Sequence, residues 1–237
     1  MRLTLDRILQ SQGIGTRRDC RTLIRAGRVT VKDVPHTDPF LSVDLSQLKD
    51  LYFSVNGQSW QYQAHVTLLM HKPAGYECSR HPTAHASVFE LLPQPLITRG
   101  VQPIGRLDQD TTGLLLLTDD GVLNHRLSSP KHHVHKVYHV TTSEPVTDTL
   151  VERLLHGVVL NDAPESLCAL AVSRLENTVL SLSIAEGKYH QVKRMVAAAG
   201  NHVVALQRVQ IGGLYLPTDL APGTWRYLNK AELSQLR

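Results

Sequence analysis

The sequence predicts an α+β protein in which a small N-terminal domain precedes a larger domain with a mainly antiparallel sheet. Segments with the apolar pattern of strands outnumber segments with a helical period, and they often follow one another directly. Basic residues are concentrated near the N-terminus, which sets that end apart from the rest. With 42% hydrophobic and 5% aromatic residues, a chain of 237 residues can bury a mostly aliphatic core.

The N-terminal domain is expected over residues 1–60, beginning with two helices and a strand. Apolar residues recur at helical spacing over residues 3–12. Thr16 is placed to cap a second helix, with Asp19 at the capping-box position three residues later. An alternating strand follows over residues 28–31.

Basic residues on the second helix predict contact with a polyanion. The candidate RNA-binding residues of this region are Arg17, Arg18, Arg21, Arg25 and Arg28. Four of them recur at spacings of four, four and three, which places them on one helix face. Residues 1–32 carry a net charge of +6, whereas the remainder carries −2. This asymmetry favours an anchoring domain for a polyanion, and the alternative is a solvated face that contacts nothing.

The larger domain is expected over residues 61–237. Further strands are predicted over residues 51–55, 66–71, 114–118, 136–142, 168–173, 179–184 and 203–211. Further helices are predicted over residues 87–92, 121–127, 147–156, 190–199 and 229–236. Asn56-Gly57 predicts a tight turn, and Pro73 with Gly75 ends the strand before them.

Two acids stand directly before the apolar run at residues 114–117. Because charge is costly to bury, an acid at the start of a core strand either caps a turn or takes part in chemistry. Asp110 precedes two threonines in a loop bracketed by glycines, so we interpret it as structural. Asp108 is the better catalytic candidate, and its alternative is a turn cap. A paired-carboxylate hydrolase is weakly indicated, since residues two apart on a loop fix no carboxylate separation.

The stretch EGKYHQVKRM, from Glu186 to Met195, places cations at the start of a helix. Lys193 and Arg194 are poorly placed there, because the helix dipole prefers anions at that end. They therefore indicate a specific anionic partner, either a protein carboxylate or a phosphate, and the alternative is ordinary surface charge. His190 and Arg194 are candidate RNA contacts.

The stretch SPKHHVHKVYHV, from Ser128 to Val140, is rich in histidine but is not predicted to bind metal. Its histidines are His132, His133, His135 and His139. No matching carboxylate or thiol lies nearby in the sequence, and basic groups interleaved with an aromatic suit nucleic acid better. Tyr138 could offer a flat face to a base, and its alternative is core packing.

Composition also restricts the compartment. Cys20, Cys78 and Cys168 are far apart and odd in number. They fit neither a disulfide framework nor a zinc site, and they favour a reducing cytoplasm. No apolar run is long enough to span a bilayer, and the first residues lack the pattern of a secretory signal.

Three of these stretches together resemble the RsuA family of pseudouridine synthases. The matching pieces are Lys72-Pro73-Ala74-Gly75, Gly105-Arg106-Leu107-Asp108, Asp110-Thr111-Thr112-Gly113-Leu114, Lys136 with Tyr138, and Glu186–Met195. The N-terminal segment resembles an S4-type RNA-binding module, the αL fold, although Asp33 and Val34 stand where that module usually turns on a glycine. The resemblance covers nearly the whole chain, and it is weakest over residues 33–65.

The resemblance implies an isomerase that converts uridine in ribosomal RNA to pseudouridine without metal or organic cofactor. It implies that Asp108 is the nucleophile, Lys193 the cation that orients it, and Tyr138 the aromatic that stacks on uracil. Arg106 is expected to contact the RNA backbone or fill the space that a flipped nucleotide leaves. The physical logic agrees, because a neighbouring cation keeps a poorly solvated carboxylate ionised and holds its direction.

Within the family, three segments look most like the small-subunit enzyme. They are Ser129–His133, the EGKYHQVKRM form, and Gly200–Val204. The implied target is uridine 516 of 16S rRNA, free or in an assembling small subunit. The alternatives are a 23S rRNA synthase and a non-catalytic rRNA-binding assembly factor. We expect a cytoplasmic monomer with no membrane partner.

Overall fold

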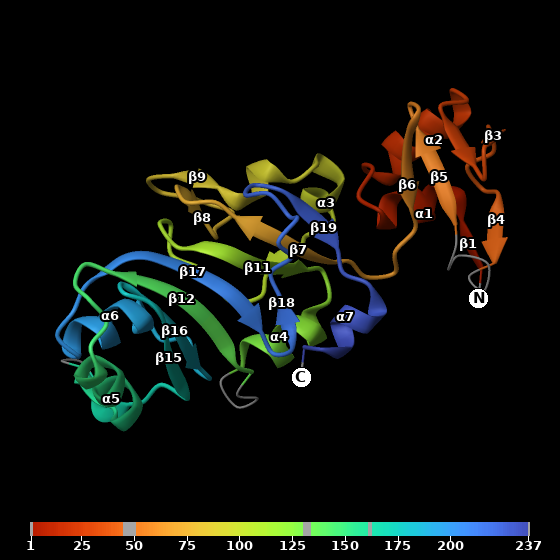
Figure 1. Cartoon of the computed structure of the whole chain (residues 1–237). Coiled ribbons are helices and arrows are strands. Elements are labelled where there is room, and N and C mark those ends of the chain that lie inside the picture. The colour runs from red at the N-terminus through yellow and green to blue at the C-terminus, as the bar shows by residue number, and fades with distance from the viewer. Residues whose placement is uncertain (1, 45–50, 130–133, 161–162, 237) are drawn as a thin grey trace. The chain divides into compact units, whose positions relative to one another are not determined.

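A computed structural model describes residues 2–44, 51–129, 134–160 and 163–236 (Figure 1). Its contacts divide the chain into two compact units. The N-terminal unit comprises Met1–Val66 together with Leu92–Val101, and the larger unit comprises Thr67–Leu91 and Gln102–Arg237. A segment from the middle of the sequence therefore packs with the N-terminal unit.

The N-terminal unit packs short helices against a small antiparallel sheet. Its helices are α1 (Leu5–Ser11), α2 (Arg17–Arg25) and α3 (Gln94–Thr98). Its four-stranded sheet has the order β3-β2-β5-β6, from β2 (Val29–Val31), β3 (Val34–His36), β5 (Tyr52–Val55) and β6 (Gln58–Gln61). Separately, β1 (Arg2–Thr4) pairs with β4 (Ser42–Asp44). The core buries Leu5, Ile8, Leu9, Cys20, Ile24, Val29, Phe53 and Val55.

Helix α2 begins where the sequence predicts. The Thr16 hydroxyl accepts a hydrogen bond from the Asp19 amide at 3.2 Å, and the Asp19 carboxylate accepts one from the Thr16 amide at 3.0 Å. The predicted capping box is therefore confirmed, and it satisfies backbone donors that a helix start leaves without partners. Ile24 faces the core at 0% exposure, as the helical period requires.

Both hairpins of this unit turn on consecutive residues with positive φ. Asn56 and Gly57 have φ of 52° and 80°, which confirms the predicted tight turn between β5 and β6. Lys32 and Asp33 have φ of 49° and 63° between β2 and β3, although neither is glycine. Aspartate tolerates this region better than most residues, so the turn forms without a glycine.

The larger unit is built on a twisted sheet of nine strands within the part of the chain that the structure describes. The main path is β15-β16-β12-β17-β11-β7-β19. In chain order its strands are β7 (Thr67–Lys72), β10 (Gln102–Pro103), β11 (Thr112–Thr118), β12 (Lys136–Thr142), β15 (Ala171–Glu176), β16 (Val179–Ile184), β17 (Val203–Ile211), β18 (Leu214–Tyr215) and β19 (Trp225–Tyr227). Every neighbouring pair is antiparallel except β11 with β17. The predicted α+β class with a mainly antiparallel sheet is confirmed.

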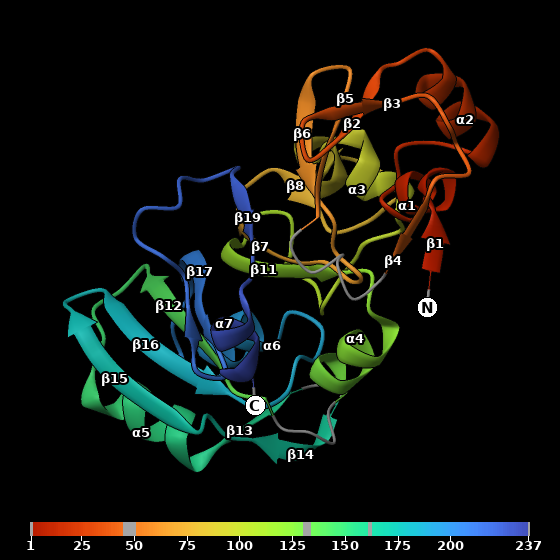
Figure 2. The ribbon, with the colours of Figure 1, turned by 90° about the vertical axis from the view of Figure 1, so that its right-hand side faces the viewer.

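Helices cover parts of this sheet, and short strand pairs form separately from it. The helical segments are η2 (Val88–Leu91), α4 (Gly121–Ser128), α5 (Asp148–His156), α6 (Gln191–Ala198) and α7 (Lys230–Ser234). Helix α5 lies against β15 in both ribbon views (Figures 1 and 2). The short pairs are β8 (Tyr76–Glu77) with β9 (Ala86–Ser87), and β13 (Val158–Leu160) with β14 (Ala163–Leu167).

The apolar run after the two acids is the central strand β11. Its residues 114–117 are all 0% exposed, flanked by β7 on one side and β17 on the other. Gly113 at the start of this strand has φ of 103°, and a Cβ there would lie 2.2 Å from the Arg208 carbonyl oxygen. Only glycine allows β11 to approach β17 so closely, which fixes the loop before Gly113 against the sheet.

One predicted strand is displaced and several short ones were not predicted. The strand expected over residues 168–173 is β15, at 171–176, because Ala169 is tied to α5 by a hydrogen bond from its amide to the Leu154 carbonyl. Strand β1 occupies the start of the helix predicted over residues 3–12. The unpredicted pairs have two to five residues per strand, too few for a recognisable alternation of apolar and polar residues.

Candidate active site

Asp108 lies in the loop between β10 and β11, and the end of β7 holds that loop in place. The Thr111 amide donates to the Asp108 carbonyl at 3.1 Å, closing a turn. The ammonium of Lys72, fully buried at the end of β7, donates to the carbonyls of Gln109 at 3.1 Å and Thr111 at 2.9 Å. The Gly75 amide donates to the Gln109 carbonyl at 2.8 Å. The Lys-Pro-Ala-Gly stretch therefore acts as a support for the Asp108 loop.

Lys72 is a buried cation whose hydrogen bonds go to backbone carbonyls, including that of Pro73 at 3.0 Å. Burial lowers its pKa, and the charges of Cys78, Asp110 and Asp108 oppose that shift. Carbonyl dipoles thus replace the water that the ammonium loses. Lys72 was predicted as part of a strand stop and as one of the pieces that carry the family resemblance, with no contact of its own assigned. A lysine closing a six-residue buried strand was the available signal.

Lys193, on α6, bridges the two carboxylates of the loop. Its Nζ lies 2.6 Å from Asp110 Oδ1 and 3.2 Å from Asp108 Oδ2. Partial burial would lower the pKa of Lys193, but hydrogen bonds and charge from Asp110 and Asp108 raise it. Partial burial would likewise raise the pKa of Asp110, but Lys193 lowers it. Asp110 therefore takes part in this ion-pair network, a contact that its interpretation as a structural turn residue did not include.

His190 also lies beside Asp108. Its Nε2 is 3.5 Å from Asp108 Oδ1, and its ring stacks on Tyr189 with 3.9 Å between centroids. It caps α6 with φ of 48°, a left-handed conformation that costs a non-glycine residue about 1–3 kcal/mol. His190 was predicted to contact RNA, with no role beside Asp108. Its proximity to Asp108 could not be read from the sequence, because the two residues are 82 positions apart.

A small cavity of about 70 Å³ opens over Asp108. Tyr138, 7% exposed on β12, forms one wall, and Arg106 lines the same cavity from the Asp108 loop. The apolar lining comes from Ile184, Val192 and Leu206, among others. The pairing of β12 with β17 shifts register between Val137 and Tyr138, an irregularity that often re-aims side chains beside functional sites. The structure thus brings Asp108, Tyr138, Arg106 and Lys193 together.

The Arg194 side chain, unlike that of Lys193, contacts a backbone carbonyl at the start of α6. Its Nη1 donates to the Tyr189 carbonyl at 3.2 Å, at the start of the same helix segment. Lys193 meets the anion predicted to face the start of α6, with the Asp108–Asp110 pair as its partner. A protein carboxylate, one of the two alternatives, is the observed one.

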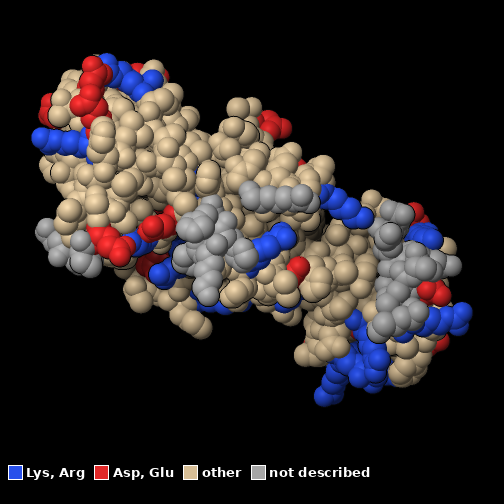
Figure 3. All heavy atoms as spheres, turned by 90° about the horizontal axis from the view of Figure 1, so that it is seen from below, with Lys and Arg blue, Asp and Glu red and all other residues tan. Residues whose placement is uncertain are grey.

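The N-terminal arginines divide into two groups. Asp6, 0% exposed on α1, lies 2.8 Å from Arg21 Nε and 3.5 Å from Arg17 Nη2. Burial would raise the pKa of Asp6, but hydrogen bonds from Thr4 and Arg21 lower it. The remaining candidates, which are exposed, are Arg18, Arg25 and Arg28. In Figure 3, Lys and Arg side chains gather on the N-terminal unit, at the right of the view.

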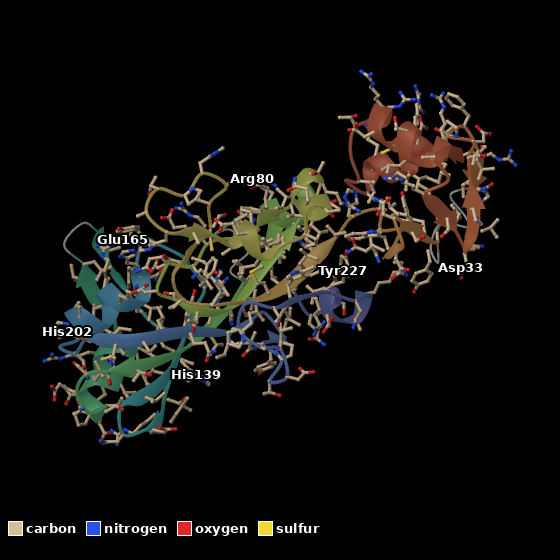
Figure 4. All side chains as sticks on the ribbon, turned by 90° about the horizontal axis from the view of Figure 1, so that it is seen from above. Asp33, Arg80, His139, Glu165, His202 and Tyr227 are labelled. Carbon is tan, nitrogen blue, oxygen red and sulfur yellow. The ribbon has the colours of Figure 1, made fainter. Side chains whose placement is uncertain are left out.

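No metal-binding cluster forms among the described residues. His135 and His139 are exposed on or beside β12, and Figure 4 labels His139 on that strand. His132 and His133, which belong to the same histidine-rich stretch, lie outside the described residues. Within the ranges given above, no helix is both long enough and apolar enough to cross a bilayer.

Comparisons with known proteins point in one direction. The family model described as RNA pseudouridylate synthase matches residues 66–198. The chain is 38% identical to ribosomal small subunit pseudouridine synthase A of Escherichia coli K12, over 99% of this chain and 100% of that protein. It is 37% identical to an uncharacterized RNA pseudouridine synthase of Bacillus subtilis, YtzG, over 99% and 98% of the two chains. A crystal structure of a pseudouridylate synthase covers 99% of this chain and 100% of its own, with a TM-score of 0.70 and 32% identity.

Proposed function

The chain belongs to the RNA pseudouridylate synthase family and is an isomerase of uridine in RNA, and from this premise we propose that its substrate is ribosomal RNA and its nucleophile Asp108. The observation that carries the proposal is the position of Asp108 in a cavity walled by Tyr138, with Lys193 at 3.2 Å. An ammonium paired with a carboxylate holds the direction in which that carboxylate points into the cavity.

The reaction exchanges one glycosidic bond for another. The bond from ribose C1′ to uracil N1 breaks, the detached ring turns, and C1′ bonds to C5, whose hydrogen leaves to water. No atom is gained or lost by the nucleotide once N1 takes up a proton. A transient bond to an Asp108 oxygen divides this exchange into two easier steps.

Lys193 orients Asp108 through the ion pair between its Nζ and Asp108 Oδ2. The ammonium is shared with Asp110, whose Oδ1 lies 2.6 Å from Lys193 Nζ. A cation fixed by a second carboxylate cannot swing away from the cavity, so the direction of Asp108 is set before substrate arrives. This division of roles makes Asp110 a positioning residue.

The target base has to leave its helix to reach this cavity. Extrusion of a paired base costs about a few kcal/mol, and less for an unpaired one. Tyr138 is placed to stack on the uracil, while Arg106 contacts the RNA backbone or fills the space left by the flipped nucleotide. Residues 1–60, which we propose to form an S4-like RNA-binding domain, offset this cost through phosphate contacts from Arg18, Arg25 and Arg28.

Within ribosomal RNA we propose 16S rRNA as the substrate, at uridine 516. The relatives named as small-subunit enzymes support this choice, since the chain matches one of them over its whole length. We further propose that the protein acts as a cytoplasmic monomer, which gel filtration with light scattering would test through the mass of the particle. Three free cysteines suit a reducing compartment.

The proposal is tested by mapping pseudouridines in ribosomal RNA from cells that lack the protein. We expect a single pseudouridine to be missing, at uridine 516 of 16S rRNA, and to return when the gene is restored. Loss of a pseudouridine in 23S rRNA would contradict the site. A complete set of rRNA pseudouridines would contradict the assignment to ribosomal RNA.

A further inference from the structure

A second cavity of about 230 Å³ adjoins the one over Asp108. Tyr138 and Arg106 line both, so the two cavities share a wall. The floor of the second cavity is apolar, formed by Ile104, Leu127 and Ile211. The site described above uses none of these three residues.

The charges of this second cavity are unbalanced. Four basic residues line it: Arg106, Lys136, Lys188 and Arg208. Glu186 is the acid among its described lining residues, and its Oε2 lies 3.2 Å from Lys188 Nζ. The Glu186 Oε2 atom is buried without a hydrogen-bond partner, and neither Lys136 nor Arg208 forms an ion pair with a carboxylate within the described chain.

Arg208 is 2% exposed on β17 and is only partly satisfied. Its Nε donates to the Leu114 carbonyl at 2.8 Å. Its Nη2 is buried and has no hydrogen-bond partner among the described residues. A buried donor left unpaired costs about 1–3 kcal/mol, and more when it is charged. The unpaired Arg208 Nη2 therefore marks a position where a ligand can accept a hydrogen bond.

Lys136 is half-buried on β12, two residues before Tyr138 and on the same strand face. Its Nζ donates to the carbonyls of Val134 at 2.9 Å and Ala185 at 3.4 Å. An ammonium has three donors, so one remains for a ligand. Burial, with the charge of Arg208, lowers the pKa of Lys136 to about 8. The other charged groups around the cavity are Arg106, Lys188 and Glu186.

We propose that this cavity binds the phosphodiester group next to the target uridine, with Lys136 and Arg208 as its ligands. The inference rests on the proposed function, because RNA in the Asp108 cavity brings a neighbouring phosphate within one nucleotide of Tyr138. A phosphate supplies the negative charge that the cavity lacks and accepts hydrogen bonds from both cations. The apolar floor then receives the ribose attached to that phosphate.

The test uses a short RNA with one target uridine and a series of single methylphosphonates, which remove the charge of one linkage at a time. For the full-length wild-type protein we expect kcat/KM to fall about tenfold when a linkage flanking the target is neutralised. Lys136→Met should show a similar fall on unmodified RNA and little further loss on the neutralised RNA. The matched control is Lys230→Met on exposed α7, which should retain the wild-type response.

A second measurement, the salt dependence of RNA binding, tests directly whether Lys136 contacts a phosphate. Lys136→Met should lower the slope of log binding constant against log salt by about 0.7, the value for one phosphate on single-stranded RNA. The inference is overturned if Lys136→Met stays as sensitive as wild type to every methylphosphonate. It is also overturned if the loss of kcat/KM caused by Lys136→Met disappears on RNA that lacks a neighbouring base but persists on every methylphosphonate RNA. Lys136 would then contact a base and not a phosphate. Absence of pseudouridine formation by wild type on unmodified ribosomal RNA would instead contradict the proposed function.

Discussion

Two carboxylate–cation clusters in this molecule use the same groups for different ends. Asp6 in the N-terminal unit is 0% exposed, and two arginines and a threonine meet its carboxylate. Asp108 in the larger unit is 30% exposed and shares a single ammonium with Asp110. A carboxylate that is fully satisfied and buried can hold α1 to α2, but it cannot react. A carboxylate that is partly exposed, as Asp108 is, can reach a substrate.

A third cluster clarifies the comparison because it contains no acid. Lys72 is as buried as Asp6, yet its partners are carbonyls of the Asp108 loop. This arrangement supports the loop without placing another negative charge beside Asp108. The three clusters therefore separate anchoring, support and reactivity, and each predicts a different response to mutation.

Among the variants that leave Asp108 in place, the largest effect is expected from Lys193→Met. Loss of the cation should lower kcat about 10³-fold, roughly 4 kcal/mol, because the shared partner of both carboxylates disappears. RNA affinity and thermal stability should change little. Filter binding beside tritium release from labelled uridine separates the two, and a defect confined to binding would contradict the role.

Asp6→Asn should act on folding instead. We expect the free energy of unfolding to fall by about 2 kcal/mol, because Arg21 and Arg17 lose a buried partner. The folded state lowers the pKa of Asp6, so this contribution is present above the ordinary value of 3.8 and is lost as pH falls below it. Urea unfolding at pH 7 and pH 3 checks the prediction, since the difference from wild type should narrow at the lower pH.

Lys72→Met should lower kcat about tenfold through the loop it supports. Three hydrogen bonds to carbonyls are lost, but the removal of a buried charge offsets part of that cost. The free energy of unfolding should therefore fall by only about 1 kcal/mol. Calorimetry and steady-state kinetics measure the two effects, and an unchanged kcat would mean that the loop holds its shape without Lys72.

Asp110→Asn is expected to have the smallest effect, a change in kcat of about threefold. The charge of Asp110 helps to raise the pKa of Lys193, so its removal should lower that pKa. Activity that needs the protonated ammonium should then be lost at lower pH on the alkaline limb than in wild type. A pH–rate profile from pH 6 to about 10.5 shows the shift, and identical alkaline limbs would leave Asp110 without a positioning role.

The sequence predicted most of the long elements, because their signals are local. The Thr16 capping box and the Asn56-Gly57 turn are written in adjacent residues. The fully buried run at residues 114–117 became the central strand for the same reason. Short strand pairs such as β13 and β14 carry too few residues for periodicity, and their pairing depends on the tertiary fold.

Site residues that lie within a single sequence motif could be predicted. Contacts between residues from two distant segments could not. Asp108, Tyr138 and Lys193 were identified through motifs, and the structure brings them together. The sharing of Lys193 by Asp110, the contact of His190 with Asp108, and the buried position of Arg208 arise from pairing between distant strands and helices. Charge on the inward side of strand 203–211 was the one available sign of Arg208.

The most direct test of the account is pseudouridine formation in 16S rRNA by Asp108→Asn, measured in single turnover with RNA affinity in parallel. We expect no detectable product, unchanged affinity and an unchanged unfolding temperature. Asp120→Asn is the matched control, because asparagine can replace aspartate as the N-cap of α4 and should leave activity intact. Product formation by Asp108→Asn at the wild-type rate would contradict the account.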